Sequence, residues 1–251
     1  MTKTDEALTR LRSDILSCRL APDSPLVIAA LTERYGLGWT PLREALSRLE
    51  AERLVISERN RGYRVAPVSA ASLVDLQEAR RAVESTLLRR SIESGDAEWE
   101  SQVVAAHYLL AQTPPPDPVM AGDRIAQWEA RHDAFHDALL AGDSSVWLAG
   151  FQHQIREQLT RHHRHMISGP APRRKMDSEA AGHFQALIER TLGLAHHTDL
   201  MDATLARDAD RAISLLNEHI GFSLAVYAFL WPEDVQDRSS LATSQDRASG
   251  R

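Results

Sequence analysis

The sequence predicts a mainly α-helical protein in which an N-terminal winged helix-turn-helix is followed by an all-α helical bundle. Three short helical patterns and a hairpin pattern occupy the first part of the chain, and helical periodicity covers nearly all of the rest. With 251 residues, the chain is long enough for one large domain or two small ones. We therefore expect two domains, over residues 1–68 and 69–235, and a polar, disordered tail over 236–251.

The composition is that of a folded protein of the cytoplasm. Hydrophobic residues make up 43% of the chain and charged residues 25%, which is ordinary for a globular protein. Cys18 is the only cysteine, so no internal disulfide can form and a reducing compartment is expected. The N-terminal sequence lacks the apolar segment of a signal peptide, and no apolar run is long enough to span a bilayer. We expect no membrane partner.

Charge is distributed unevenly along the chain. The formal net charge of −6 argues against a general polyanion-binding protein. Residues 1–68 nevertheless carry a net charge of +2, and the remaining residues carry −8. A small nucleic-acid-binding domain joined to an acidic partner domain would give this distribution, and so would chance.

Helical spacing predicts three helices in the first domain, over 8–16, 28–36 and 40–55. Two prolines within 21–26 end the first helix, and Gly36 is a favourable C-cap for the second. The third is expected to start with Thr40 as its N-cap and Pro41 as its first residue. The short link between the second and third helices is typical of a helix-turn-helix.

A hairpin pattern follows the third helix directly. Val55–Ser57 and Tyr63–Val65 are predicted to be short strands on either side of a turn that contains Asn60, Arg61 and Gly62. A hairpin in this place is the wing of a winged helix-turn-helix.

The N-terminal residues of a recognition helix face base edges in the major groove. Here those residues are Trp39, Thr40 and Arg43. Arg43 lies on the first helical turn, where the helix dipole favours acidic residues, and an arginine there suits a guanine or a phosphate. The alternative is a solvated Arg43 that pairs with a nearby acid. Arg61 and Arg64 on the wing are candidates for contacts to the DNA backbone or the minor groove.

The rest of the chain is predicted to be helical, over about 72–94, 97–112, 121–141, 144–166, 177–206 and 208–231. Within it, His132 and His136 are spaced i, i+4 and share one helix face. His197 and His219 fall on two consecutive helices that would run antiparallel. Four imidazoles from three helices would form a site for Zn²⁺, Ni²⁺ or a similar ion. The alternative is that these histidines are partly buried and hydrogen-bonded.

The order of motifs resembles the GntR family of bacterial transcription regulators. The helix TPLREALSRLEAERLV is followed by NRGYRV, and the all-α part resembles the FCD ligand-binding domain of the FadR-like branch. The resemblance implies a DNA-binding regulator in which Thr40, Arg43, Arg61 and Gly62 occupy DNA-contact positions. Two departures stand out. Gly38-Trp39 replaces the usual Ser-Arg, and Cys18 and Asp23 occur where the family often has glycine.

The same resemblance implies a metal site. Many members of this branch carry one Asp and three His, and His136, His197 and His219 match the three histidines. His132 occupies the position of the aspartate, so the site is a set of four histidines unless Asp133 contributes. His183 is a rival for the position of His197. The metal is expected to be Zn or Ni.

The family also implies a small carboxylate effector, held by the metal and by arginine. Arg80 occurs where the first helix of the effector domain commonly points an arginine inward, and Arg161 is a second candidate. The alternative for each is a surface salt bridge, such as one between Arg80 and Glu84.

The function that we expect is that of a homodimeric transcription repressor whose DNA binding changes when the effector binds. Two alternatives remain. One is a metal-dependent enzyme that uses the histidine cluster, with Glu129 or Asp133 as general base, although the chain has no nucleophile elbow, phosphate loop or HExxH motif. The other is a sensor for which the metal itself is the effector. We expect the protein not to be an enzyme.

Overall fold

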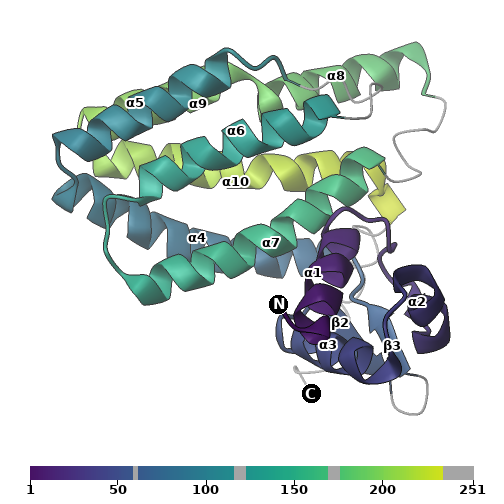
Figure 1. Ribbon diagram of the computed structural model, residues 1–251. Coiled ribbons are helices and arrows are strands. Elements are labelled where there is room, and N and C mark those ends of the chain that lie inside the picture. The colour runs from purple at the N-terminus through teal and green to yellow at the C-terminus, as the bar shows by residue number, and fades with distance from the viewer. Residues whose placement is uncertain (59–61, 116–122, 169–175, 234–251) are drawn as a thin grey trace, which may run out of the picture.

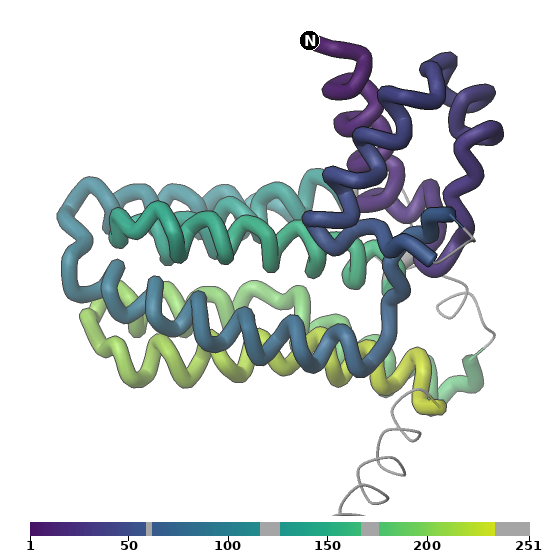
Figure 2. Tube along the Cα trace, turned by 90° about the horizontal axis from the view of Figure 1, so that it is seen from below, coloured from purple at the N-terminus to yellow at the C-terminus, as the bar shows by residue number. Residues whose placement is uncertain are grey.

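The structure is a computed structural model that describes residues 1–58, 62–115, 123–168 and 176–233. A small winged domain lies at one end of an elongated layered bundle of helices (Figures 1 and 2). The fold class predicted from the sequence is thus confirmed. The tail expected over 236–251 lies outside the described residues.

The N-terminal domain consists of three helices and a three-stranded sheet: α1 (Lys3–Leu16), β1 (Pro25–Leu26), α2 (Ile28–Tyr35), α3 (Trp39–Ala51), β2 (Val55–Glu58) and β3 (Gly62–Val65). The sheet is antiparallel, in the order β1-β3-β2. Fully buried leucines of α1 and α3, such as Leu11, Leu42 and Leu46, fill the core between the helices and the sheet. Their burial fixes α3 against α1 and leaves its opposite face exposed.

The start of α3 corrects one detail of the prediction. The N-cap is Gly38 and not Thr40, so that Pro41 is the third helical residue and not the first. Proline is tolerated there because the first-turn amides have no carbonyl partner within the helix. Gly38 has no side chain to cap the helix, so the leading amides of α3 receive no side-chain cap.

Three residues of this domain other than glycine have left-handed backbones, and one of them is Arg53, with φ +59°, in the turn between α3 and β2. Cys18 has φ +56° and Asp23 has φ +65°. These are the two positions at which the sequence departs from the glycine that the GntR resemblance led us to expect. The backbone conformation that favours glycine is therefore retained without the glycine.

Seven helices form the described part of the second domain: α4 (Ala70–Ser94), α5 (Ala97–Ala111), α6 (Asp123–Leu140), α7 (Val146–Ser168), α8 (Ser178–Leu192), α9 (Leu194–Leu205) and α10 (Ala209–Leu230). α10 packs against α4, α7, α8 and α9, and in the view of Figure 1 it lies between α6 and α4. By length and composition alone, α10 is also the one helix of the described residues that could cross a membrane. A buried core helix meets the same criteria, and α10 occupies such a place.

The single helix predicted over 177–206 is wrong, because Gly193 divides it into α8 and α9. Gly193 is both the last cap of α8 and the first cap of α9, with an extended backbone at φ −67° and ψ 147°. A Cβ atom added at Gly193 would lie 2.3 Å from the carbonyl oxygen of Glu189. The residue must therefore be glycine for the chain to turn so tightly, and the turn sets the direction in which α9 enters the bundle.

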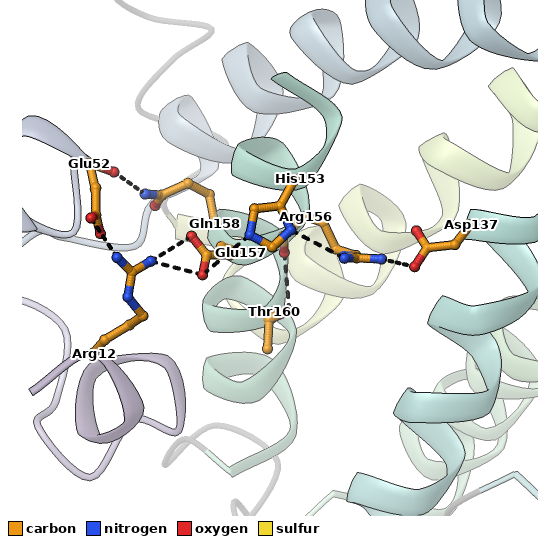
Figure 3. Close-up of polar contacts among 8 residues, drawn as sticks. All are labelled: Arg12, Glu52, Asp137, His153, Arg156, Glu157, Gln158 and Thr160. Atoms are coloured by element: carbon orange, nitrogen blue, oxygen red, sulfur yellow. Dashed lines mark hydrogen bonds and ion pairs between the residues drawn. The ribbon is translucent and has the colours of Figure 1, made fainter. Parts of the chain in front are cut away.

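Polar contacts join the two domains along the second half of α7 (Figure 3). Arg12 of α1 donates to both carboxylate oxygens of Glu157 at 2.9 Å and also pairs with Glu52 at the end of α3. Gln158 donates to the carbonyl oxygen of Glu52 at 2.9 Å. Arg161 donates to the carbonyl oxygen of Ala66, in the segment that connects the domains. α7 thus contacts both the C-terminal end of α3, the recognition helix, and the core of the helical domain.

A double-mutant cycle on Arg12 and Glu157 tests this junction. Their side chains are 27% and 21% exposed, against 42% and 41% for the ion pair between Arg10 and Glu6 within α1. We expect a coupling free energy of about 0.5–1 kcal/mol for Arg12–Glu157 from urea unfolding of the alanine variants, and a smaller value for Arg10–Glu6. A coupling of zero for Arg12–Glu157 would show that the junction is not held by this pair.

Candidate metal centre, effector cavity and DNA-binding face

The structure brings together the four histidines that the sequence singled out. His132 and His136 come from α6, His197 from α9 and His219 from α10. One ring nitrogen from each of the four lies within 4.8 Å of those from the other three. The centroids of these rings are 4.5–5.6 Å apart in pairs. The imidazoles therefore converge on one point from three helices.

Three of the converging nitrogens lack a hydrogen-bond partner within the described residues. They are Nε2 of His136, Nε2 of His197 and Nδ1 of His219, and all three are buried. Unpartnered buried polar atoms are rare in native structures and call for an explanation. A metal ion at the centre of the cluster would use all three lone pairs at once.

The tautomer of His197 is set by its neighbour. Its Nδ1 lies 2.8 Å from the carbonyl oxygen of Gly193 and donates to it. Nδ1 therefore carries the proton, and Nε2 carries the lone pair that faces the other rings. This carbonyl oxygen belongs to the N-cap residue of α9, four residues before His197, and His162 makes the same contact to Gln158 within α7.

Burial and the proximity of the other rings keep His136, His197 and His219 neutral. Desolvation, with repulsion from neighbouring histidines, lowers the pKa of His136 and of His219 well below the ordinary value. The same causes lower the pKa of His197 to about 3. These three imidazoles are consequently in the unprotonated form that metal ions require.

The residues present fit a divalent metal ion of the zinc type. A set of imidazole ligands suits Zn²⁺, Ni²⁺ or Cu²⁺ better than Mg²⁺ or Ca²⁺, which prefer oxygen. Asp133 does not join the cluster. Its Oδ1 lies 3.6 Å from Nδ1 of His132, beside that ring.

His183 does not reach the cluster. It is exposed on α8, and its ring packs against Phe229 at a centroid distance of 5.2 Å. His197, and not its alternative His183, provides the third helix's histidine in the cluster. His183 therefore provides a matched control for substitutions of the clustered histidines.

Replacing Gly193 with alanine tests whether the turn between α8 and α9 requires glycine. The added Cβ atom would clash with the carbonyl oxygen of Glu189, so we expect the free energy of unfolding to fall by about 1–3 kcal/mol. Gly182, in α8, has nothing within 4 Å of an added Cβ, and alanine there is expected to stabilise by about 0.5–1 kcal/mol. Thermal unfolding of both variants checks this, and an unchanged Gly193→Ala protein would contradict the account of the turn.

A cavity of about 110 Å³ adjoins the histidines. It lies among α4, α6, α7, α8 and α10, and His132, His136 and His219 form part of its wall. Arg80 lines it together with Glu84, and Nε of Arg80 lies 2.8 Å from a carboxylate oxygen of Glu84. The ion pair that was the alternative for Arg80 thus exists, but it is buried in the wall of the cavity and not at the surface.

α7 contributes cavity residues that the sequence analysis missed. Arg156 and His163 line the cavity, and Arg156 also pairs with Asp137 of α6 (Figure 3). Burial lowers the pKa of His163 to about 3, so its ring is neutral. The helical spacing of Gln152, Arg156 and His163 along α7 was the available signal.

Arg161, the second predicted effector residue, does not line the cavity. It is 2% exposed, and it donates to Ala66 and to the side-chain oxygen of Gln158 at the domain junction. Burial lowers its pKa to about 10. Five residues separate it from Arg156, which places the two on different faces of α7. The prediction that Arg161 contacts the effector is therefore corrected: it holds the domains together.

The predicted recognition residues are exposed at the start of α3. Trp39 is 59% exposed, and Thr40 and Arg43 are exposed beside it. In the described part of the chain, no carboxylate forms an ion pair with Arg43. The helix start, its free amides and a cation thus share one solvent-facing surface.

The wing contributes less than predicted among the residues that can be placed. Gly62 begins β3 with φ +86°, a conformation that favours glycine. Arg64 is occupied within the sheet, where it donates to Glu58 at 3.0 Å and to the carbonyl oxygen of Asp23 at 2.6 Å. Arg61 lies outside the described residues.

A winged helix-turn-helix with an exposed recognition helix, joined to a helical domain with an internal cavity, defines a DNA-binding transcription regulator. The chain belongs to the GntR family. Residues 3–65 match "Bacterial regulatory proteins, gntR family" and residues 75–222 match the FCD domain. The family resemblance seen in the sequence is confirmed. The family and the relatives described next are transcription regulators. The interpretation of this chain as a metal-dependent enzyme is therefore excluded.

Two relatives match most of the chain. BphR of Paraburkholderia xenovorans, an uncharacterized HTH-type transcriptional regulator, is 37% identical over 220 residues, which cover 86% of this chain and 82% of BphR. The HTH-type transcriptional repressor GlaR of Escherichia coli is 36% identical over 217 residues, which cover 84% of this chain and 89% of GlaR.

Solved structures show the same fold. A GntR transcriptional regulator from Rhodococcus sp. RHA1 matches with a TM-score of 0.62 and 22% identity, over 90% of this chain and 97% of the other. E. coli McbR/YncC matches with a TM-score of 0.61 and 19% identity, over 93% and 99%. At these identities the similarity establishes the arrangement of the two domains and not their ligands.

Proposed function

We propose that the protein is a cytoplasmic, homodimeric repressor whose DNA binding is controlled by a small carboxylate held at a metal ion in the helical domain. The observation that carries the proposal is the set of three unpartnered buried ring nitrogens beside a cavity that also contains Arg80. The relative GlaR is named a repressor, which supports the direction of control. The domain limits that we propose are residues 1–68 and 69–235, with the tail after them.

Four histidines would hold the metal: His132, His136, His197 and His219. When bound, the metal supplies positive charge that attracts and orients a carboxylate. Asp133 and the carbonyl oxygen of Gly193 would orient two of the rings. Arg80 would place a cation at the cavity wall, with Glu84 holding its guanidinium in position.

DNA would be bound through the start of α3. Trp39 and Thr40 would approach the phosphate backbone through the amides of the first turn, and Arg43 would contact a base edge or a phosphate. Arg61 and Gly62 of the wing are proposed to lie along the backbone, and Arg64 to support the wing from within the sheet. A two-fold dimer would place two such surfaces on successive half-sites.

The route from cavity to DNA would run through α7. Arg156 lines the cavity, and the next two residues along the helix, Glu157 and Gln158, contact Arg12 and Glu52 of the DNA-binding domain. An effector that prefers one position of α7 would therefore prefer one position of the DNA-binding domains.

An operator selected from random DNA tests the proposal. Fluorescence anisotropy with metal-loaded protein should show sequence-specific, salt-dependent binding that small carboxylates weaken by about 5- to 150-fold. Specific binding that metal removal abolishes and that no carboxylate alters would favour the alternative of a metal sensor. Absence of any specific binding would contradict the proposal.

A further inference from the structure

We propose that the cavity selects a short monocarboxylate with an apolar tail, and disfavours dicarboxylates. This inference rests on the proposed function, because the carboxylate head is placed at the histidine cluster. What it adds is the class of effector, which follows from the shape, charge and size of the cavity.

The cavity has an apolar part away from the metal centre. His219 lies at one level of α10, and Val226 lies seven residues further on, or about 10 Å along the helix. Val226 packs in one hydrophobic cluster with Leu159, Met166 and Ile188, and all four line the cavity. A ligand bound by its carboxylate at the histidines would direct the rest of its body toward these side chains.

Hydroxyl groups in the wall are already used within their own helices. Thr160 donates to the carbonyl oxygen of Arg156 at 3.0 Å, and Thr191 donates to that of Leu187 at 2.7 Å. Glu129 and Ser223 line the cavity as well, and both are already engaged, Glu129 by Arg164 at 2.9 Å and Ser223 by Gln77 at 2.8 Å. His163 adds a neutral imidazole, which does not balance a second carboxylate. A polar tail would therefore lose its hydration without gaining equal partners.

The charges around the cavity balance one negative ligand charge. Three ion pairs at the cavity each have a net charge of zero: Arg80–Glu84, Arg156–Asp137 and Arg164–Glu129. Among the described lining residues, Asp133 is the carboxylate left over. A divalent metal ion raises the sum from −1 to +1, and a monocarboxylate then brings it to zero. A dicarboxylate would leave a buried net charge of −1, which is costly.

The volume limits the length of the tail. A buried cavity of about 150 Å³ accepts benzene, which has six carbons, and this one has about 110 Å³. If the number of carbons scales with the volume of the cavity, about four carbons fit, as in butyrate.

Titrations with the Co²⁺-loaded full-length protein test the proposal, because the visible absorption of Co²⁺ reports a ligand arriving at the metal. We expect butyrate to bind at least about 100-fold more tightly than acetate, since butyrate has two more methylenes and each one placed in an apolar pocket contributes about tenfold or more. Succinate, which has the same number of carbons, should bind more weakly than butyrate.

Val226→Thr identifies the tail site, because it keeps the shape of the side chain and adds a hydroxyl. Butyrate affinity should fall several-fold while acetate affinity stays unchanged, and Val104→Thr on the exposed face of α5 should alter neither. The Co²⁺ spectrum without ligand verifies that each variant retains the site. Tighter binding of succinate than of butyrate would overturn this inference and leave the proposed function standing. Failure of every carboxylate to perturb the spectrum would overturn both.

Discussion

Replacing His219 with alanine is expected to lower the affinity for Zn²⁺ by more than about 100-fold. Loss of a hydrogen-bond partner behind a metal ligand already costs about 10- to 100-fold, and His219 provides one of the three unpartnered buried nitrogens themselves. Without metal, the free energy of unfolding of His219→Ala should fall only by the cost of the small cavity that the missing ring leaves. Nδ1 of His219 makes no hydrogen bond that the substitution could remove. Isothermal titration of Zn²⁺ measures the affinity directly.

The matched control is His183→Ala, on the exposed face of α8. It should bind Zn²⁺ as wild type does, and its melting temperature should rise with added Zn²⁺ as that of wild type does. The melting temperature of His219→Ala should respond little. Equal affinity of His219→Ala and wild type would show that the convergence of the rings reflects packing and not a metal site.

Replacing Arg43 with alanine is expected to weaken operator binding by about 1–3 kcal/mol, or about 5- to 150-fold. Arg43 is exposed, so the loss cannot be ascribed to damage of the core. If it contacts a base, discrimination at one operator position relaxes. If it contacts a phosphate, binding weakens on all sequences and the salt dependence decreases by about one counterion.

Arg211→Ala is the control for charge, because Arg211 is an exposed arginine on α10 in the second domain. Its operator affinity should match that of wild type at the same salt concentration. If Arg43→Ala and Arg211→Ala bind equally well, the start of α3 does not read the operator. The wing would then become the first candidate for recognition.

The sequence predicted the cluster of four histidines in part because helical spacing is a reliable guide to which side chains share a face. His132 and His136 are one turn apart, and that alone aligns them. What the sequence concealed was the break at Gly193, since an isolated glycine within a long helical pattern is compatible with a continuous helix. The break depends on a close approach to Glu189, which only the folded chain shows.

The cavity was harder to predict than the cluster. On α7, the predicted effector residue is Arg161, whereas Arg156 lines the cavity. Both are arginines on the same helix, and their roles depend on which side of α7 meets the bundle and which meets the DNA-binding domain. Helical spacing groups Gln152, Arg156 and His163 on one side of α7, but packing between the domains decides what that side meets. The strand β1 was missed because two residues are too few to show alternation.

The most direct test of the account is the effect of a carboxylate on operator affinity in wild type and in His219→Ala, measured side by side by fluorescence anisotropy. The carboxylate used is the one with the largest effect on wild type in the panel. The account predicts that it changes the affinity of wild type by at least about fivefold and leaves that of His219→Ala unchanged, while both proteins bind the operator specifically without it. An equal response of the two proteins would contradict control through the histidine site.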